Sequence, residues 1–147
     1  MTSSSSHKNG DAFSPEAQKY FCGLRRARIW CNPPYGPGQI ETWVGFCRGL
    51  AVSGVAETLA MLLPATLETD WAKDLFAFQE THEIRLASRR ISFFLNGVRT
   101  RSPKTGSIIA VLHNHPRANT DVPDISYWSV PCDAKSYITI DWETISQ

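Results

Sequence analysis

Four consecutive residues, Asn32, Pro33, Pro34 and Tyr35, carry the most specific chemistry in this sequence. Proline has no backbone N–H, so the two prolines leave this stretch with carbonyl acceptors and few donors. The Asn32 side chain adds another carbonyl oxygen. An amino group with two N–H donors could give one hydrogen bond to the Asn32 side chain and the other to the Pro33 carbonyl. The pattern therefore predicts a clamp for an amine.

Such a clamp favours chemistry at the amine nitrogen. When an electrophilic carbon bonds to that nitrogen, positive charge grows there, and both acceptors bind it more strongly in the transition state than in the ground state. Tyr35 adds a flat ring, on which a planar base could stack with a gain of about 1–3 kcal/mol. We therefore predict amino-group methylation. The simpler interpretation is a strand-ending turn, because Asn-Pro and Pro-Pro are common turn dipeptides.

The residues around the motif predict the elements that would position it. The short apolar run "ARIWC" (27–31) predicts a buried strand that ends at the prolines. Apolar residues at helical spacing then predict a helix of about 40–52. Similar patterns predict a turn and a short helix in 11–24, with Ser14 as cap and Pro15 at its first position. The remaining predictions are strands at 57–64, 82–87, 89–95 and 107–113, a helix at 68–79, a polar, basic loop at 97–106, and either a strand or a docked tail at 136–142.

The order of these elements predicts the fold class. Strand, helix, strand and helix, followed by closely spaced strands, indicate an α/β domain with a mostly parallel sheet that ends in an antiparallel hairpin. Ligands in such sheets bind beyond the carboxyl ends of the strands, which is where Asn32 would lie. Pro64 and Ala65 end another strand and are expected at the same edge.

Length and composition limit the function. The 147 residues suggest one domain, divided into a disordered polar tail (1–10), a core (11–113) and an irregular C-terminal extension (114–147). The net charge of +1 means that binding to nucleic acid must depend on local basic patches. No apolar run reaches the roughly 20 residues of a membrane span, so we expect no membrane partner. Four cysteines without paired spacing favour reduced thiols and a cytoplasmic protein.

Beyond the motif itself, "WCNPPYG" resembles the catalytic motif of amino-group methyltransferases that use S-adenosylmethionine. "IETWV", "LLPATLETDW", "EIRLASRRISF" and "SPKTGSIIAVL" follow in order. This series resembles the phage-type, Dam-like DNA N6-adenine methyltransferases over about residues 11–113. The resemblance implies a Rossmann-like fold and S-adenosylmethionine as cofactor. It also implies double-stranded DNA as partner, and an adenine flipped out of the duplex. Asn32, Pro33, Pro34 and Tyr35 would be the catalytic residues.

The resemblance also implies binding residues outside the motif. Asp11 and Ala12 would border the adenosine of the cofactor. Only about ten polar residues precede Asp11, where the family carries a segment for the methionine part, so we expect an N-terminally truncated member. Phosphate contacts are expected from the loop residues Arg99, Arg101 and Lys104 and from Arg89 and Arg90. For Arg89 and Arg90, a solvated strand end is an equally good interpretation.

Two other functions stay open. Enzymes that methylate protein glutamine share Asn-Pro-Pro-Tyr, and a chain without the cofactor segment could be an inactive remnant that only binds DNA. We expect no metal site, because no carboxylate or thiol motif accompanies the pair His113 and His115.

Overall fold

The computed structural model describes residues 12–91, 94–95, 98–99, 105–118 and 121–129. The predicted polar tail (1–10) and the segment predicted at 136–142 lie outside these residues. The elements are, in order, α1 (Pro15–Gly23), β1 (Ala27–Cys31), α2 (Gln39–Val52), β2 (Ala56–Pro64), α3 (Asp70–Ala77), β3 (Thr81–Ala87), β4 (Phe94–Leu95), β5 (Val98–Arg99), β6 (Ser107–His113) and β7 (Asp124–Trp128).

Five of the strands form one mixed sheet, in the order β1-β2-β6-β3-β7. The pairs β1–β2 and β3–β7 are parallel, whereas β6 runs antiparallel to both of its neighbours. The prediction of a mostly parallel sheet is therefore wrong. The predicted antiparallel hairpin exists as the pair β3 and β6. No helix separates these two strands among the described residues. The chain therefore returns to the sheet on the side where β3 ends, and β6 runs in the opposite direction between β2 and β3.

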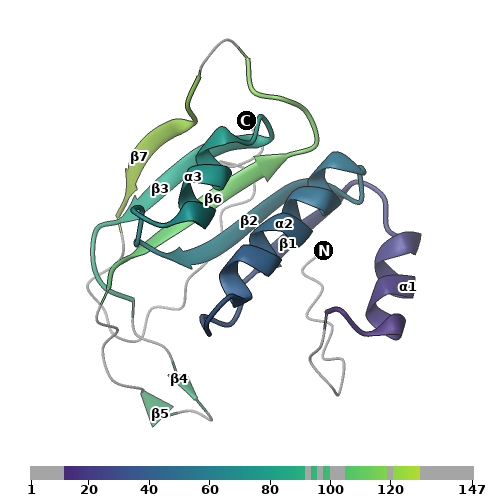
Figure 1. Cartoon of the computed structure of the whole chain (residues 1–147), viewed down its shortest axis with the longest axis horizontal. Coiled ribbons are helices and arrows are strands. Elements are labelled where there is room, and N and C mark those ends of the chain that lie inside the picture. Colours follow the sequence, from purple (N-terminus) through teal and green to yellow (C-terminus); the bar gives the residue numbers. More distant parts are fainter. Residues whose placement is uncertain (1–11, 92–93, 96–97, 100–104, 119–120, 130–147) are drawn as a thin grey trace.

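Helices α2 and α3 lie side by side on one face of this sheet (Figure 1). They bury Val44, Cys47 and Leu75, among others, against Leu59, Met61 and Leu63 of β2. The alternate β2 residues Ala60 and Leu62 face the opposite side, where they pack with Ile109 and Val111 of β6. Strand β2 is thus buried on both faces, which explains why its sequence is a continuous apolar run.

The first helix begins as the sequence predicts. Ser14 precedes α1 with extended backbone, and its hydroxyl accepts a hydrogen bond from the Ala17 N–H at 3.2 Å. Pro15 occupies the first helical position, where its missing N–H costs nothing. None of the helices in the described part of the chain is long and apolar enough to cross a membrane; α2 has 14 residues.

Three predictions about the later part of the chain differ from the structure. The predicted strand at 89–95 contributes only β4, because the exposed Arg89 and Arg90 lie outside the sheet and β4 pairs with β5 in a separate ribbon. The predicted basic loop 97–106 accordingly contains β5. The predicted irregular extension 114–147 contributes β7, which joins the main sheet beside β3. Strand β7 has four exposed residues and a half-buried Trp128, and Ile125 and Tyr127 are among the exposed ones, so its short alternation of polar and apolar residues does not correspond to a buried face.

Candidate functional site

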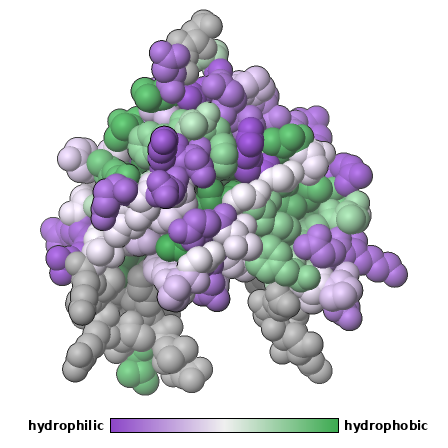
Figure 2. Space-filling view, in the orientation of Figure 1, coloured by the Kyte–Doolittle hydropathy of each residue, from purple (hydrophilic) through white to green (hydrophobic). Residues whose placement is uncertain are grey.

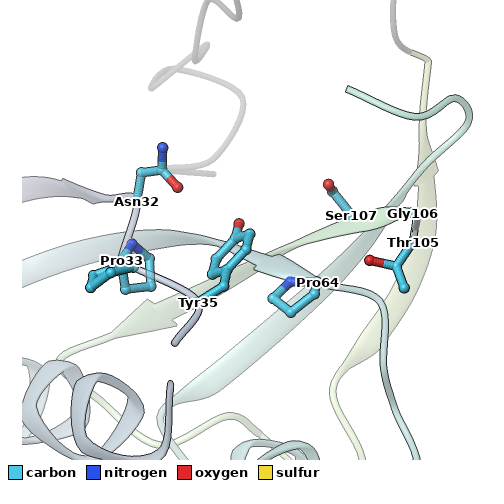
Figure 3. A pocket seen from close by; sticks show the side chains of 8 residues that line it. Asn32, Pro33, Tyr35, Pro64, Thr105, Gly106 and Ser107 are labelled. Carbon is cyan, nitrogen blue, oxygen red and sulfur yellow. The ribbon is translucent and has the colours of Figure 1, made fainter. Parts of the chain in front are cut away.

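A pocket of about 340 Å³ opens at the edge of the sheet where β1 and β2 end and β6 begins (Figure 3). Its lining comes from the loop after β1, from the last residue of β2 and from the start of β6. The lining residues are Asn32, Pro33, Pro34, Tyr35, Pro64, Thr105, Gly106 and Ser107. The structure thus brings together all four residues of the predicted amine clamp, and Pro64 lies at the predicted edge.

Hydrogen bonds fix the second half of the loop that carries the clamp. The Tyr35 hydroxyl donates a hydrogen bond to the Leu62 carbonyl in β2 at 3.0 Å. The Gly36 N–H donates to the Gln39 side chain at 2.9 Å, and the Gln39 N–H donates back to the Gly36 carbonyl at 3.1 Å. Gly38 has a φ of 71°, which glycine adopts without strain just before α2. The clamp residues are therefore positioned before any substrate binds.

Both predicted acceptors are available. Among the described residues, no hydrogen bond involves the Asn32 side chain or the Pro33 carbonyl oxygen. Asn32 is exposed and Pro33 is buried. In Figure 3 the Asn32 side chain projects from one rim of the pocket, and the Tyr35 ring lies between Asn32 and Pro64. Tyr35 as a whole residue is 40% exposed and lines the pocket, so part of it is accessible to a ligand.

The lining residues that the structure describes include no acidic or basic side chain. Burial, followed by the nearby Cys31, raises the pKa of the Tyr35 hydroxyl to about 12. Tyr35 therefore stays neutral at physiological pH and keeps its hydrogen bond to Leu62. An arrangement of neutral acceptors with no general base can hold an amine and stabilise growing positive charge on it.

The predicted DNA-binding residues are only partly described. Arg89 and Arg90 are exposed and follow β3. Since β3 runs in the same direction as β1, they leave the sheet at the edge that carries the pocket. Three strand spacings separate β3 from β1, or about 14 Å. The backbone of Arg99 lies in β5. Arg101 and Lys104 lie outside the described residues.

Of the two predicted cofactor residues, only Ala12 is described, and it does not line the pocket. Asp11 lies outside the described residues. Ala12 precedes α1, and its carbonyl accepts a hydrogen bond from the Gln18 side chain at 3.4 Å. The next residue, Phe13, packs against Trp43 and Phe46 of α2, with ring centroids 4.9 Å apart in each case. Figure 2 shows a hydrophobic area on the side of α2 that faces α1.

This arrangement limits what the pocket could hold of S-adenosylmethionine. The methionine part carries an ammonium and a carboxylate, and no charged side chain among the described lining residues could pair with either. These residues fit an amine, and they offer no charged partner for the methionine part of the methyl donor.

The sequence did not predict the wall formed by Thr105, Gly106 and Ser107. The predicted hairpin contained a signal for this wall. The second strand of a hairpin begins beside the end of the first strand, so its first residues lie at the same end of the sheet as the motif. The sequence also missed that His82 joins the pair His113 and His115, with ring centroids 4.6 and 4.7 Å away. Within the described ranges, no group of three or more histidine, cysteine, aspartate or glutamate side chains is placed to hold a metal ion.

Comparison with known proteins assigns no family. No protein-family model, curated protein or solved structure matches this chain.

Proposed function

We propose that this chain methylates the N6 amine of adenine in double-stranded DNA. The observation that carries the proposal is the pair of unengaged acceptors, the Asn32 side chain and the Pro33 carbonyl, beside a fixed Tyr35 ring in an uncharged pocket. The adenine is flipped out of the duplex, because its amine is otherwise engaged in base pairing.

In this proposal, Asn32 and Pro33 each accept one hydrogen bond from the adenine amine. The nitrogen lone pair is then directed out of the plane of the two bonds. S-adenosylmethionine supplies an electrophilic methyl group when bound. As positive charge grows on the nitrogen, both acceptors bind it more tightly, which lowers the barrier. The described lining residues include no base, so in this proposal the proton that the nitrogen loses passes to solvent.

The arrangement of the sheet supports a Rossmann-like methyltransferase fold. Strands β1, β2 and β3 run in one direction and are connected through α2 and α3, and the pocket lies beyond the carboxyl ends of β1 and β2. Arg89 and Arg90 at the same edge are placed to contact phosphates about 14 Å from the base. A DNA substrate implies action in the cytoplasm of a bacterial or phage-infected cell.

The direct test incubates the purified chain with S-adenosylmethionine labelled in its methyl group. Unmethylated bacterial DNA and a glutamine-bearing release factor serve as alternative substrates. We expect label in DNA, recovered as N6-methyladenine after digestion. Label in the release factor would instead establish glutamine methylation. Folded protein that labels neither substrate and gives no calorimetric heat with S-adenosylmethionine would identify an inactive remnant.

The first prediction concerns Asn32. Asn32→Ala removes one of the two acceptors, and we expect the methylation rate to fall by about 10²–10³-fold, because such a group contributes roughly 3 kcal/mol in comparable sites. The melting temperature should stay unchanged, since the side chain is exposed and makes no hydrogen bond within the described residues.

Gln79→Ala is the matched control for this variant. It removes another exposed amide, just before β3 and thus at the opposite edge of the sheet, and should leave the rate unchanged. Full activity of Asn32→Ala would eliminate the assigned role.

A further inference from the structure

Two hydroxyl groups form the wall of the pocket opposite Asn32. Thr105 and Ser107 flank Gly106 at the start of β6, and all three line the pocket. The Gly106 carbonyl accepts a hydrogen bond from the Ala65 N–H at 2.9 Å, and Ser107 pairs with Pro64 in the sheet. This wall therefore has a fixed backbone. In Figure 3 the hydroxyl oxygens of Thr105 and Ser107 point away from their strand, toward the side on which Asn32 and Tyr35 lie.

Ser107 is largely buried, but its hydroxyl oxygen remains accessible at the pocket. Only 4% of the residue is exposed, and no hydrogen bond of its side chain occurs within the described part of the chain. By comparison, the Thr58 hydroxyl bonds His113 at the other end of the β2–β6 pair, and Thr69 donates to the Thr66 carbonyl. Among the described residues, Thr81 has the fully buried side-chain hydroxyl without a partner, whereas the Ser107 hydroxyl is open to the pocket. Ser107 therefore has a hydrogen bond to offer to the content of the pocket.

The rest of the lining shows what kind of partner is missing. The clamp offers carbonyl acceptors, and the prolines and the Tyr35 ring offer apolar surface. Adenine presents more than its amine, because ring nitrogens that only accept hydrogen bonds flank the amine on both sides. A hydroxyl can donate to such a nitrogen, whereas the carbonyls of the clamp cannot.

We propose that Ser107 donates a hydrogen bond to a ring nitrogen of the target adenine, and that Thr105 supports this contact from the rim. Ser107 is then a specificity-determining residue for an aminopurine. This inference rests on the proposed function, since it requires the base to enter the pocket.

The test pairs side-chain deletions with atom deletions in the base. Ser107→Ala and Thr105→Val remove one hydroxyl each, and Ser126→Ala removes an exposed serine of β7 as a control. Each variant is given pools of duplex DNA in which every adenine is unmodified, or is replaced by 7-deazaadenine or by 1-deazaadenine. The readouts are the single-turnover methylation rate and the binding affinity for each pool.

We expect Ser107→Ala to lower the ratio of rate to dissociation constant about tenfold on unmodified DNA. On the pool that lacks the partner nitrogen, the same substitution should change this ratio less than twofold. Thr105→Val should have a smaller effect and Ser126→Ala none. The melting temperature of Ser107→Ala should equal that of the wild type, because the side chain has no hydrogen bond to lose.

The outcomes separate this inference from the proposed function. Methylation that is unaffected by Ser107→Ala, or reduced equally on all three pools, overturns the contact and leaves the methyltransferase proposal intact. DNA binding that depends on Ser107 and on a ring nitrogen, without methylation, overturns the methyltransferase proposal and supports the contact. Absence of both methylation and DNA binding overturns both.

Discussion

At the scale of single residues, Tyr35 combines a stacking surface with an anchor. Its hydroxyl bonds the Leu62 carbonyl, so the ring cannot turn freely. We predict that Tyr35→Phe keeps most of the affinity for DNA but lowers the methylation rate about fivefold to tenfold, because one hydrogen bond of about 1 kcal/mol no longer fixes the ring. Tyr35→Ala should also lose stacking of about 1–3 kcal/mol and so weaken base capture more than cofactor binding.

The fluorescence of 2-aminopurine placed at target adenines measures base capture for both Tyr35 variants. Calorimetry with S-adenosylmethionine measures cofactor binding. Equal effects of Tyr35→Phe and Tyr35→Ala on base capture would argue against a stacking role for the ring.

The uncharged lining leads to a second prediction at this scale. Among the lining residues that the structure describes, Tyr35 is the only titratable one, and its pKa is raised to about 12. None of these residues changes charge between about pH 6 and 9, so we expect the single-turnover methylation rate to be flat over that range. Rapid-quench measurements at saturating DNA and donor provide the check. A bell-shaped profile centred near pH 7 would indicate a general base that the described pocket does not contain.

At the scale of elements, the sequence predicts strands and helices well where burial leaves a periodic or continuous apolar pattern. Strands β1, β2 and β6 are apolar runs, and α2 repeats its apolar residues at helical spacing. Strand β7 could not be predicted, because its partner β3 supplies hydrogen bonds while its own side chains stay mostly exposed. The same distinction applies to the site: Asn32 to Tyr35 form a local motif, whereas Ser107 joins them only through the pairing of β2 with β6.

Arg117 connects the end of α3, the start of β3 and the segment before β7 through hydrogen bonds. Arg117 is 8% exposed and donates to the carbonyls of Phe76 and Phe78 at the end of α3, and to those of Thr81 and Asp121. A positive charge at the carboxyl end of a helix is also favourable.

We predict that Arg117→Met lowers the free energy of unfolding by about 3 kcal/mol, because buried carbonyls lose a charged donor. Urea denaturation measures this value, and Arg90→Met, at an exposed arginine, should change it by less than about 0.5 kcal/mol. A loss below about 1 kcal/mol for Arg117→Met would show that other bonds suffice to hold the segment that follows β6.

At the scale of the whole molecule, the mixed sheet differs between the edge at which β1, β2 and β3 end and the edge at which they begin. The pocket and the exposed Arg89 and Arg90 lie where these strands end. At the opposite edge, where β6 ends, His113 packs against His82 and His115. The sequence could not predict this division, because it depends on the insertion of β6 between β2 and β3, a pairing between segments far apart in the chain.

The packing of His82, His113 and His115 predicts how the free energy of unfolding depends on pH. Burial, followed by the charges of His82 and His115, lowers the pKa of His113 from 6.5 to about 4, although the Glu57 carbonyl and carboxylate act in the opposite direction. Between pH 6.5 and 4 the unfolded chain therefore binds more protons at His113 than the folded chain does. The contribution of His113 to stability is fully present above about pH 6.5 and is lost as the pH falls toward 4.

We expect this contribution to be on the order of 1 kcal/mol, because His113 is only half-buried and solvent screens its charge. Urea denaturation at several pH values should show the free energy of unfolding falling below pH 6.5, and His113→Gln should flatten this slope. Glutamine cannot be protonated in this range, and its amide can still bond the Thr58 hydroxyl that now lies 2.9 Å from the His113 ring. Lys73→Gln at an exposed position of α3 serves as the control, and an unchanged slope in His113→Gln would assign the acid sensitivity to other groups.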